Sequence, residues 1–532
     1  MKIMLAQLNS KVGDIQGNCQ RILTQMQHAQ QQACDVIVFP ELALTGYPPE
    51  DLLLRKSFMD VVDQALLKIT SASTQCICIL GHPRREDSLL YNSASLLSNG
   101  QCIDTYDKQA LPNYGVFDEQ RYFSKGSSAK TFTVHGWHIG ISICEDLWND
   151  DVARQQQSCD MVFSLNASPF HLGKQQEREK LLQARARQWN SPICYINMVG
   201  GQDEVVFDGG SCVIDSEGDL MSRLAIFVED DAFYSMQQLE PHPQASIPSE
   251  LEGMHKALIM GIHDYVRLNH GQQVLLGLSG GIDSALTAVL AVQALGAENV
   301  LGVLMPSAFS SDHSIHDAED LARHLNIETT TLAIAEPVEM VEKTLKPSFE
   351  KWQKTTSDVT EENIQARMRA LLLMAISNKT GRMLLTTGNK SEMAVGYATL
   401  YGDMAGGFAP LKDVYKTQVF ALSRHINHKH EIIPWNTIEK PPSAELRPDQ
   451  FDSDNLPNYD DLDAILQASI EDRLSSEEIS RHLNIPLTEV QRIVHLLYLA
   501  EYKRRQAPPG IKITSRSFGR ERRYPITHQF RD

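Results

Sequence analysis

The chain has 532 residues, of which 42% are hydrophobic and 22% charged, and its formal net charge is −18. Because one hydrophobic core rarely supports so long a chain, we expect two or three domains. The acidic balance argues against a general nucleic-acid binder, since phosphate contacts need basic surface, and no apolar run approaches the length needed to cross a bilayer.

The first residues, Lys2 to Leu8, have the character of a strand rather than of a charged segment followed by a long apolar stretch. We therefore see no export signal. Nine cysteines lie between residues 19 and 212, an odd number that fits no disulfide framework and indicates a reducing compartment. We expect a cytoplasmic protein with no membrane partner.

Short apolar segments recur through the first 230 residues. Several are continuously apolar, which is typical of strands that are buried on both faces and covered by helices. The predicted strands cover residues 36–39, 77–80, 139–143, 161–165, 193–196 and 211–214. From about residue 229 to residue 248 the sequence turns acidic and proline-rich and loses strand character, so we predict a linker at 236–250 between domains at 1–235 and 251–532.

Three reactive residues lie at or just beyond the ends of predicted strands, where their side chains can converge: Glu41, Lys108 and Cys144. A cysteine with a pKa of about 8.5 is mostly protonated at neutral pH, so attack on an amide needs a neighbouring base, for which we predict Glu41. The attack creates an oxyanion, which the ammonium of Lys108 can stabilise. Together these residues predict a cysteine amidase.

The same three residues resemble the Glu-Lys-Cys triad of the nitrilase superfamily, and the likeness covers most of residues 1–225. The motifs Leu44-Thr-Gly-Tyr47 and Tyr114-Gly-Val-Phe-Asp-Glu-Gln-Arg-Tyr-Phe123 match as well. The resemblance implies a nitrilase-like α-β-β-α sandwich. It also implies that Tyr114, Ser168 and Lys174 hold the amino-acid end of glutamine.

After the predicted linker, strands and helices alternate as in an α/β, doubly wound parallel sheet. We predict helices at 251–268, 284–295 and 316–325, and strands at 274–278, 300–304 and 328–332. In such folds the ligand binds at the carboxyl ends of the strands. Further along we predict a loop at 441–457, a capping box at 475–478 that opens a short helix, and a helix at 488–502.

The segment Ser279-Gly-Gly-Ile-Asp-Ser284 lies where the first of these strands gives way to a helix. Its glycines allow close backbone approach, and its N–H groups and the helix N-terminus favour phosphate, against which Asp283 can hold magnesium. The spacing is not that of a Walker loop, and no lysine follows the glycines. The segment resembles the pyrophosphate loop of ATP pyrophosphatases, which adenylate a carbonyl oxygen and release pyrophosphate.

Seven further motifs resemble glutamine-dependent NAD synthetases, and they occur in that family's order. They lie at residues 305–311, 362–369, 386–392, 401–403, 410–416, 441–446 and 503–509, among them Pro410-Leu-Lys-Asp-Val-Tyr-Lys416. The resemblance implies that ATP is bound by Ser279, Gly280, Gly281, Ile282, Asp283, Ser284, Thr387, Lys416 and Ser443. It implies that Asp283 and Glu392 bind magnesium (Mg²⁺). It further implies that deamido-NAD contacts Asn363, Arg367, Glu392 and Lys503.

We therefore expect the first domain to hydrolyse glutamine and to deliver the ammonia through a protected passage to the second domain, where deamido-NAD has been adenylated by ATP. The products expected here are therefore NAD, AMP, pyrophosphate and glutamate, and the resemblance also implies a homo-oligomer. Between residues 503 and 523 eight basic residues accompany one acid, Glu521. Composition alone leaves open whether that segment binds RNA, is a solvated tail or covers an anionic small ligand, while the resemblance favours the last.

Other functions remain possible on the sequence. One is a different ATP-pyrophosphatase amidotransferase, but asparagine synthetases use an N-terminal cysteine, whereas residue 2 here is Lys. GMP synthetases carry a Cys-His-Glu glutaminase of another fold, and a tRNA-modifying relative would need a broader basic surface. A nucleotide-sensing scaffold without catalysis is the other possibility, and the presence of Cys144 and Asp283 speaks against it.

Overall fold

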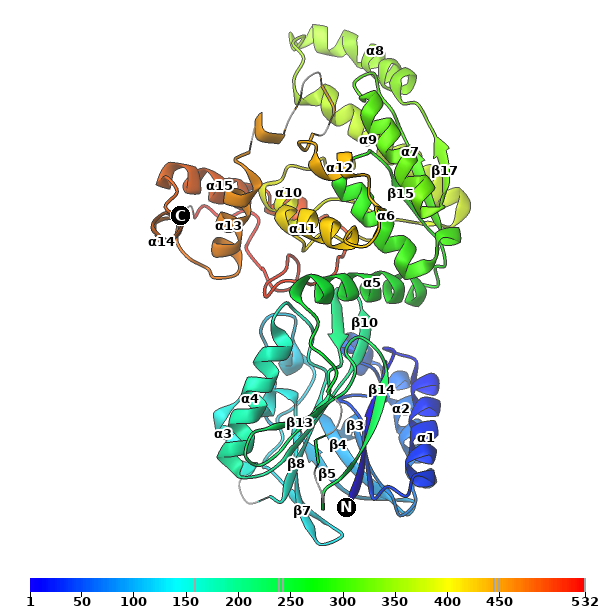
Figure 1. Ribbon diagram of the computed structural model, residues 1–532, viewed down its shortest axis with the longest axis vertical. Helices are drawn as coiled ribbons and strands as arrows, with labels where there is room; N and C mark the ends of the chain where they lie inside the picture. The colour runs from blue at the N-terminus through cyan, green and yellow to red at the C-terminus, as the bar shows by residue number, and fades with distance from the viewer. Residues whose placement is uncertain are drawn as a thin grey trace. The chain divides into compact units, whose positions relative to one another are not determined.

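The structure is a computed structural model that describes residues 1–156, 159–237, 240–241, 244–443, 445–447, 450, 452–454 and 456–530. It divides into two compact units, Met1–Glu250 and Leu251–Asp532 (Figure 1). Within the described ranges no helix combines the length and apolarity that a membrane crossing requires.

Two six-stranded sheets form the first unit, in the orders β14-β1-β2-β3-β4-β5 and β13-β12-β9-β8-β7-β6. The first sheet consists of β1 (Lys2–Gln7), β2 (Val36–Val38), β3 (Ile77–Glu86), β4 (Leu89–Ser98), β5 (Gln101–Asp107) and β14 (Asp230–Ser235). The second consists of β6 (Thr131–Val134), β7 (Trp137–Ile143), β8 (Met161–Asn166), β9 (Ile193–Asn197), β12 (Cys212–Ile214) and β13 (Leu220–Arg223). A small hairpin adds β10 (Val199–Gln202) and β11 (Val205–Asp208).

Apolar layers hold this unit together. The inner faces of the two sheets share one core, in which Val36 and Val38 of β2 and Ile139 and Ile141 of β7 are buried. On the outer faces, α1 (Ile15–Gln31) and α2 (Lys56–Ala72) cover the first sheet, and α4 (Lys174–Trp189) covers the second (Figure 1). Strands such as β2 are therefore buried on both faces, which explains their continuous apolar sequence. The predicted α-β-β-α sandwich is confirmed.

The strands of the first unit continue beyond the predicted end near residue 229, as far as Ser235. β14 pairs antiparallel with β1, from Lys2 opposite Ser235 to Gln7 opposite Asp230. The expectation that strand character ends near residue 229 is therefore wrong. β14 lies at the edge of its sheet and most of its side chains are only half-buried, so acidic residues are tolerated there and hide the strand pattern.

A four-stranded parallel sheet of order β17-β16-β15-β18 forms the centre of the second unit. Its strands are β15 (Val274–Gly277), β16 (Val300–Leu304), β17 (Glu328–Thr331) and β18 (Met383–Leu384). The helices that follow or flank them are α5 (Glu250–Leu268), α6 (Ile282–Leu295), α7 (Asp312–Leu325), α8 (Ala335–Lys351) and α9 (Val359–Thr380). This confirms the predicted parallel α/β architecture.

A helical region completes the second unit around its own apolar core. Its helices, with two that flank it, are α10 (Lys390–Val395), α11 (Lys416–Ile426), α12 (Trp435–Glu439), α13 (Tyr459–Ile470), α14 (Ser476–Leu483), α15 (Leu487–Leu499) and α16 (Glu501–Arg504). The capping box opening α14 is present, while the helix predicted at 488–502 is divided into α15 and α16. Of the loop predicted at 441–457, positions 444, 448, 449, 451 and 455 lie outside the described residues.

Several basic side chains of the segment 503–523 form buried ion pairs within this fold. Arg504 and Arg522 are buried and both pair with Glu501. Lys512 pairs with Glu521 at 2.7 Å and is also buried. These side chains stabilise the packing of the chain against itself, so the segment is not a solvated tail.

Candidate active sites

The first unit brings Glu41, Lys108 and Cys144 together. They follow β2, β5 and β7 respectively, so strand ends from both sheets meet at one point. The Lys108 ammonium donates to Glu41 Oε1 at 2.7 Å, and each of these two residues is 1% exposed. The charges of both act on the buried Cys144 thiol.

Glu41 is held in a single orientation by three donors. Its Oε1 accepts from Lys108 and, at 2.8 Å, from Asn92 Nδ2. Its Oε2 accepts from the backbone N–H of Ala167 at 3.0 Å. A carboxylate fixed in this way beside a thiol is suited to serve as a general base.

Cys144 begins the short 3₁₀ turn Cys144–Leu147 after β7, and its φ of 45° lies in the left-handed region. A non-glycine residue rarely adopts this conformation, and residues that do are concentrated at functional sites. Burial, and then the Glu41 carboxylate, raise the pKa of the Cys144 thiol well above its ordinary value. The resting residue is thus a thiol, and its activation requires a base to remove the proton.

Glu119 is a second buried carboxylate at this centre, which the sequence did not single out. Its Oε1 accepts from Lys108 Nζ at 2.8 Å and from the Tyr47 hydroxyl at 2.8 Å. Burial raises the pKa of Glu119 to about 7, against the opposing effect of the Lys108 ammonium. The residue stands inside the matched motif at 114–123, but only the fold distinguishes it from its neighbour Asp118.

Replacing Glu119 by Gln should remove a pH-dependent loss of stability. Because the pKa of Glu119 in the folded protein lies above its unfolded value, the folded state binds more protons than the unfolded chain between about pH 4.5 and about pH 7, and stability falls as pH rises through that window. The melting temperature of the native chain should therefore fall relative to that of Glu119→Gln as pH rises from about 4.5 to about 7. Parallel curves would contradict this, and Glu217→Gln, in an exposed turn, is the control.

Two of the three residues expected to hold glutamine, Tyr114 and Lys174, lie near enough to Cys144 for their charges to interact with it. The Tyr114 hydroxyl donates to both carboxylate oxygens of Glu145, at 3.0 and 2.9 Å. The Lys174 ammonium lies 4.2 Å from the centre of the Trp148 ring, and the charges of Cys144 and Lys174 interact. Glu145 was missed by the sequence analysis, although it directly follows Cys144. A carboxylate and an ammonium together can complement the two charged groups of a free amino acid.

Ser168, the third of them, is anchored from two sides. Its backbone N–H donates to Asn197 Oδ1 at 2.9 Å, and its hydroxyl accepts from Arg178 Nε at 3.0 Å. Arg178 itself is buried and forms an ion pair with Asp208 at 2.7 Å. This network fixes the segment that also supplies the Ala167 N–H to Glu41.

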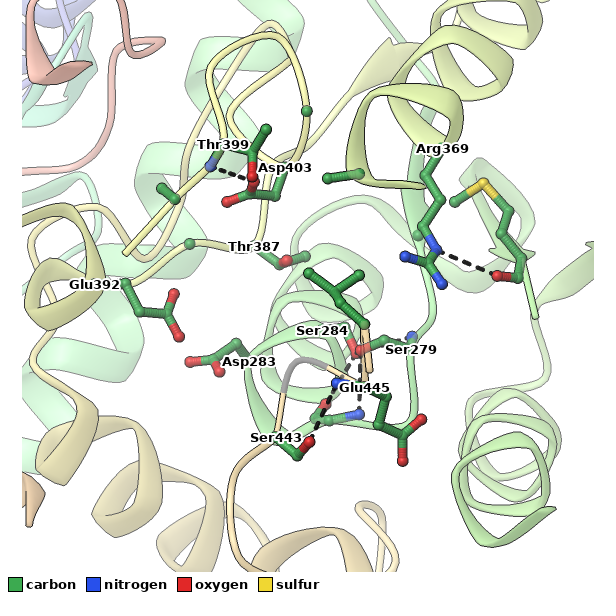
Figure 2. A pocket seen from close by; sticks show the side chains of 18 of the residues that line it. Ser279, Asp283, Ser284, Arg369, Thr387, Glu392, Thr399, Asp403, Ser443 and Glu445 are labelled. Carbon is green, nitrogen blue, oxygen red and sulfur yellow. Dashed lines mark hydrogen bonds between the residues drawn. The ribbon is translucent and has the colours of Figure 1, made fainter. Parts of the chain in front are cut away.

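The second unit contains a cavity of about 490 Å³ at the carboxyl ends of β15 and β16 (Figure 2). Most of the predicted nucleotide-site residues line it. They are Ser279, Gly281, Ile282, Asp283, Ser284, Asn363, Thr387, Glu392, Lys416, Ser443 and Lys503. Gly280 and Arg367 are not among the lining residues.

The loop between β15 and α6 is ordered by its own hydroxyl groups. Ser284 Oγ donates to the Gly281 carbonyl at 2.9 Å and accepts from the Ser279 N–H at 3.3 Å. Gly280 has a φ of 77°, and a Cβ at this position would overlap the Ser314 carbonyl oxygen. Gly280 therefore acts behind the cavity wall, by allowing the loop to pack against α7.

Replacing Gly280 by Ala should lower turnover at the nucleotide site. The added methyl group has to displace the loop from Ser314, and a misplacement of about 1 Å can lower a rate by about tenfold or more. Gly381→Ala is the matched control, since Gly381 also has a positive φ of 73° but no atom within 4 Å of the added Cβ. The rate of nucleotide-dependent pyrophosphate release is measured for both variants. An equal loss of rate in the two variants would contradict the role assigned to the loop.

Asp283 and Glu392 face one another across the cavity (Figure 2). Asp283 accepts from Asn389 Nδ2 at 2.9 Å and pairs with Lys416, whose ammonium lies 3.5 Å from Glu392. Burial and the charge of Asp283 raise the pKa of Glu392 to about 8. A divalent cation between the two carboxylates would hold Glu392 in its ionised form.

The residues present therefore suit magnesium, which is commonly held by one or two carboxylates together with substrate phosphates and water. The part of the chain that the structure describes contains no group of three or more His, Cys, Asp or Glu able to hold a metal. The remaining ligands would have to come from the phosphates and from water.

Comparison with known proteins agrees with both units. A carbon-nitrogen hydrolase family model matches residues 2–234, and an NAD synthase family model matches residues 254–507. The glutamine-dependent NAD(+) synthetase of Synechocystis sp. is 44% identical over 554 aligned residues, which cover 99% of each chain. That of Thermotoga maritima is 42% identical and covers 100% of this chain and 99% of its own.

The chain belongs to the glutamine-dependent NAD(+) synthetases. The solved glutamine-dependent NAD(+) synthetase of Acinetobacter baumannii, in complex with ADP, is 40% identical, with a TM-score of 0.80 over 99% of this chain and 98% of that one. The corresponding protein of Cytophaga hutchinsonii is 24% identical and has the same fold, with a TM-score of 0.85.

In this member of the NAD(+) synthetases, Arg369 lines the cavity while Arg367 does not. Arg367 Nε donates to the Leu400 carbonyl at 3.1 Å, and Arg369 Nε donates to the Met305 carbonyl at 3.3 Å. Burial lowers the pKa of Arg369, against the opposing effect of the Glu445 carboxylate. Residues two apart lie on different faces of a helix, so the sequence motif alone did not determine which arginine faces the ligand.

Replacing Arg369 by Met should raise the KM for ATP or for deamido-NAD by about tenfold or more, because a hydrogen bond to a charged group contributes about 1.5–3 kcal/mol. Arg367→Met is the matched control on the same helix, and a smaller effect is expected from it. The measurement is steady-state kinetics with each nucleotide varied in turn. An equal or larger effect of Arg367→Met would instead support the deamido-NAD contact that the family resemblance implies for that residue.

Lys503 lines the cavity and is held by the backbone. Its ammonium donates to the carbonyls of Gly396 and Ala398, both at 2.7 Å, and burial lowers its pKa. Through these two hydrogen bonds Lys503 orders the loop that carries Thr399 and Asp403. Its expected contact with deamido-NAD stays a prediction.

Proposed function

We propose that the chain catalyses the ATP-dependent amidation of deamido-NAD to NAD, the last step of NAD biosynthesis, with ammonia taken from glutamine. One observation carries this proposal. The chain is similar to glutamine-dependent NAD(+) synthetases over almost their whole length, and it contains both a buried Glu41–Lys108–Cys144 centre and, in its second unit, a cavity large enough for a nucleotide. Glutamine and ATP are the co-substrates.

Glutamine hydrolysis follows from the geometry of the first unit. Glu41 removes the thiol proton of Cys144 as sulfur attacks the carboxamide carbon, and the Lys108 ammonium stabilises the oxyanion. The proton held by Glu41 passes to the departing nitrogen, so ammonia leaves and a thioester remains. Water then attacks the thioester with Glu41 as base, and glutamate leaves as the thiol is restored.

Amidation occurs at the cavity of the second unit. The nicotinate carboxylate of deamido-NAD attacks the α-phosphorus of ATP and releases pyrophosphate, after which ammonia attacks the adenylated carbonyl carbon and AMP leaves. The loop at 279–284, with Thr387, Lys416 and Ser443, would hold ATP, and Asn363, Glu392 and Lys503 would hold deamido-NAD together with Arg369, which lines the cavity. The family resemblance implies Arg367 in this role, but Arg367 is not among the lining residues. Asp283 and Glu392 would bind magnesium, which when bound offsets phosphate charge.

Ammonia has to reach the second reaction unprotonated, because ammonium is not a nucleophile, so we also propose that it is transferred without release to bulk water. A cytoplasmic location is supported by nine free cysteines, which suit a reducing compartment. The homo-oligomer stays a proposal from the family resemblance.

Replacing Cys144 by Ala should lower glutamine-dependent NAD formation by at least about 1,000-fold, because the nucleophile is removed. Formation of NAD from ammonium chloride should be unchanged, since the second unit keeps its residues. Cys159→Ala, which changes another buried cysteine of the same unit, is the control and should leave both activities intact.

Loss of turnover with both nitrogen donors in the Cys144 variant would refute the division of labour. Pyrophosphate release by the native chain should require deamido-NAD, and release with XMP or aspartate instead would favour a different amidotransferase.

A further inference from the structure

Asp146 is a buried carboxylate two residues after the nucleophile, and it is 1% exposed. Its two oxygens accept four hydrogen bonds. Oδ1 accepts from the backbone N–H groups of Gln109 at 3.1 Å and Ala110 at 2.8 Å. Oδ2 accepts from the backbone N–H of Ile143 at 2.9 Å and from the Tyr106 hydroxyl at 2.8 Å.

These donors come from the two sheets of the first unit. Tyr106 lies in β5, and Gln109 and Ala110 directly follow Lys108 at the end of that strand. Ile143 is the last residue of β7 and directly precedes Cys144. Asp146 therefore ties the backbone that carries Lys108 to the backbone that carries Cys144.

The contacts also act on the conformation of the nucleophile. The bond from Ile143 N–H to Asp146 closes the turn in which Cys144 has its φ of 45°. A strained residue keeps such a conformation only when its surroundings fix it. The buried Asp146 carboxylate accepts hydrogen bonds from two different strands and their ends. It therefore fixes both the turn and the distance between the two strands.

We propose that Asp146 is a positioning residue for glutamine hydrolysis, which aligns the Cys144 sulfur and the Lys108 ammonium on the same carbonyl group. This inference rests on the proposed role of Cys144 as nucleophile. Asp146 itself does not touch the substrate. It acts through the two backbone segments that it joins.

Asp146→Asn tests the proposal with little change of volume. An amide has one acceptor oxygen, while each carboxylate oxygen of Asp146 faces two donors. If the amide oxygen keeps the bonds from Gln109 and Ala110, the amide nitrogen faces Tyr106, whose hydroxyl can turn to accept, and Ile143, whose N–H cannot. The substitution therefore releases the turn at Cys144 in particular.

The expected result is a fall of about 100-fold in kcat for glutamine hydrolysis, with the KM for glutamine within about threefold of the native value. Ammonium-dependent NAD formation should be unchanged. Tyr106→Phe is the matched control, because it removes the hydroxyl donor to Asp146 and leaves all three backbone bonds, so its kcat should stay close to the native one.

Glutamine binding to Cys144→Ala with and without Asp146→Asn, measured by calorimetry, separates positioning from folding. Retained binding together with the loss of kcat supports the proposal. Lost binding, or a kcat that Asp146→Asn leaves unchanged, overturns it. The proposed function is judged separately, since it fails only if Cys144→Ala by itself keeps glutamine-dependent activity.

Discussion

The site of the first unit depends on the buried ammonium group of Lys108. Lys108 is almost inaccessible to solvent, and its ammonium donates to both Glu41 and Glu119. Removing a charge from water carries a large free-energy penalty, which is offset only when the charge is paired and hydrogen-bonded. The lysine and its two carboxylates therefore have to be buried together, at the point where the strand ends of two sheets meet.

The second unit uses the same arrangement for another purpose. Lys416 is buried and contacts both Asp283 and Glu392, beside the loop that is suited to phosphate. Here the cavity is open to a polyanion and a divalent cation, which can take over as partners of the lysine and of the carboxylates. A lysine that stays paired with its two carboxylates, like Lys108, suits covalent catalysis by a thiol. A lysine whose carboxylates can exchange it for other partners, like Lys416, suits nucleotide binding.

Local chemistry made much of both sites predictable. Glu41 and Cys144 could be identified because they follow the buried strands β2 and β7, and strand ends are where side chains converge. Lys108 follows β5, which is mostly exposed, so only its combination with the other two residues pointed to it. Glu119 and Asp146 could not, because an acid inside a loop or turn has the same local sequence whether it is solvated or buried. β14 was missed for a related reason, since an edge strand is not required to be apolar.

The sequence alone indicated the alternating strands and helices of the second unit, because apolar periodicity is a property of the chain. The resemblance of its motifs to known families implied the sandwich of the first unit and the chemistry expected at both sites. Only the tertiary structure decided which acids are buried beside Lys108, and that Arg369 rather than Arg367 lines the cavity. Those outcomes depend on burial and on distances between residues remote in the chain, which arise only when the sheets and helices pack.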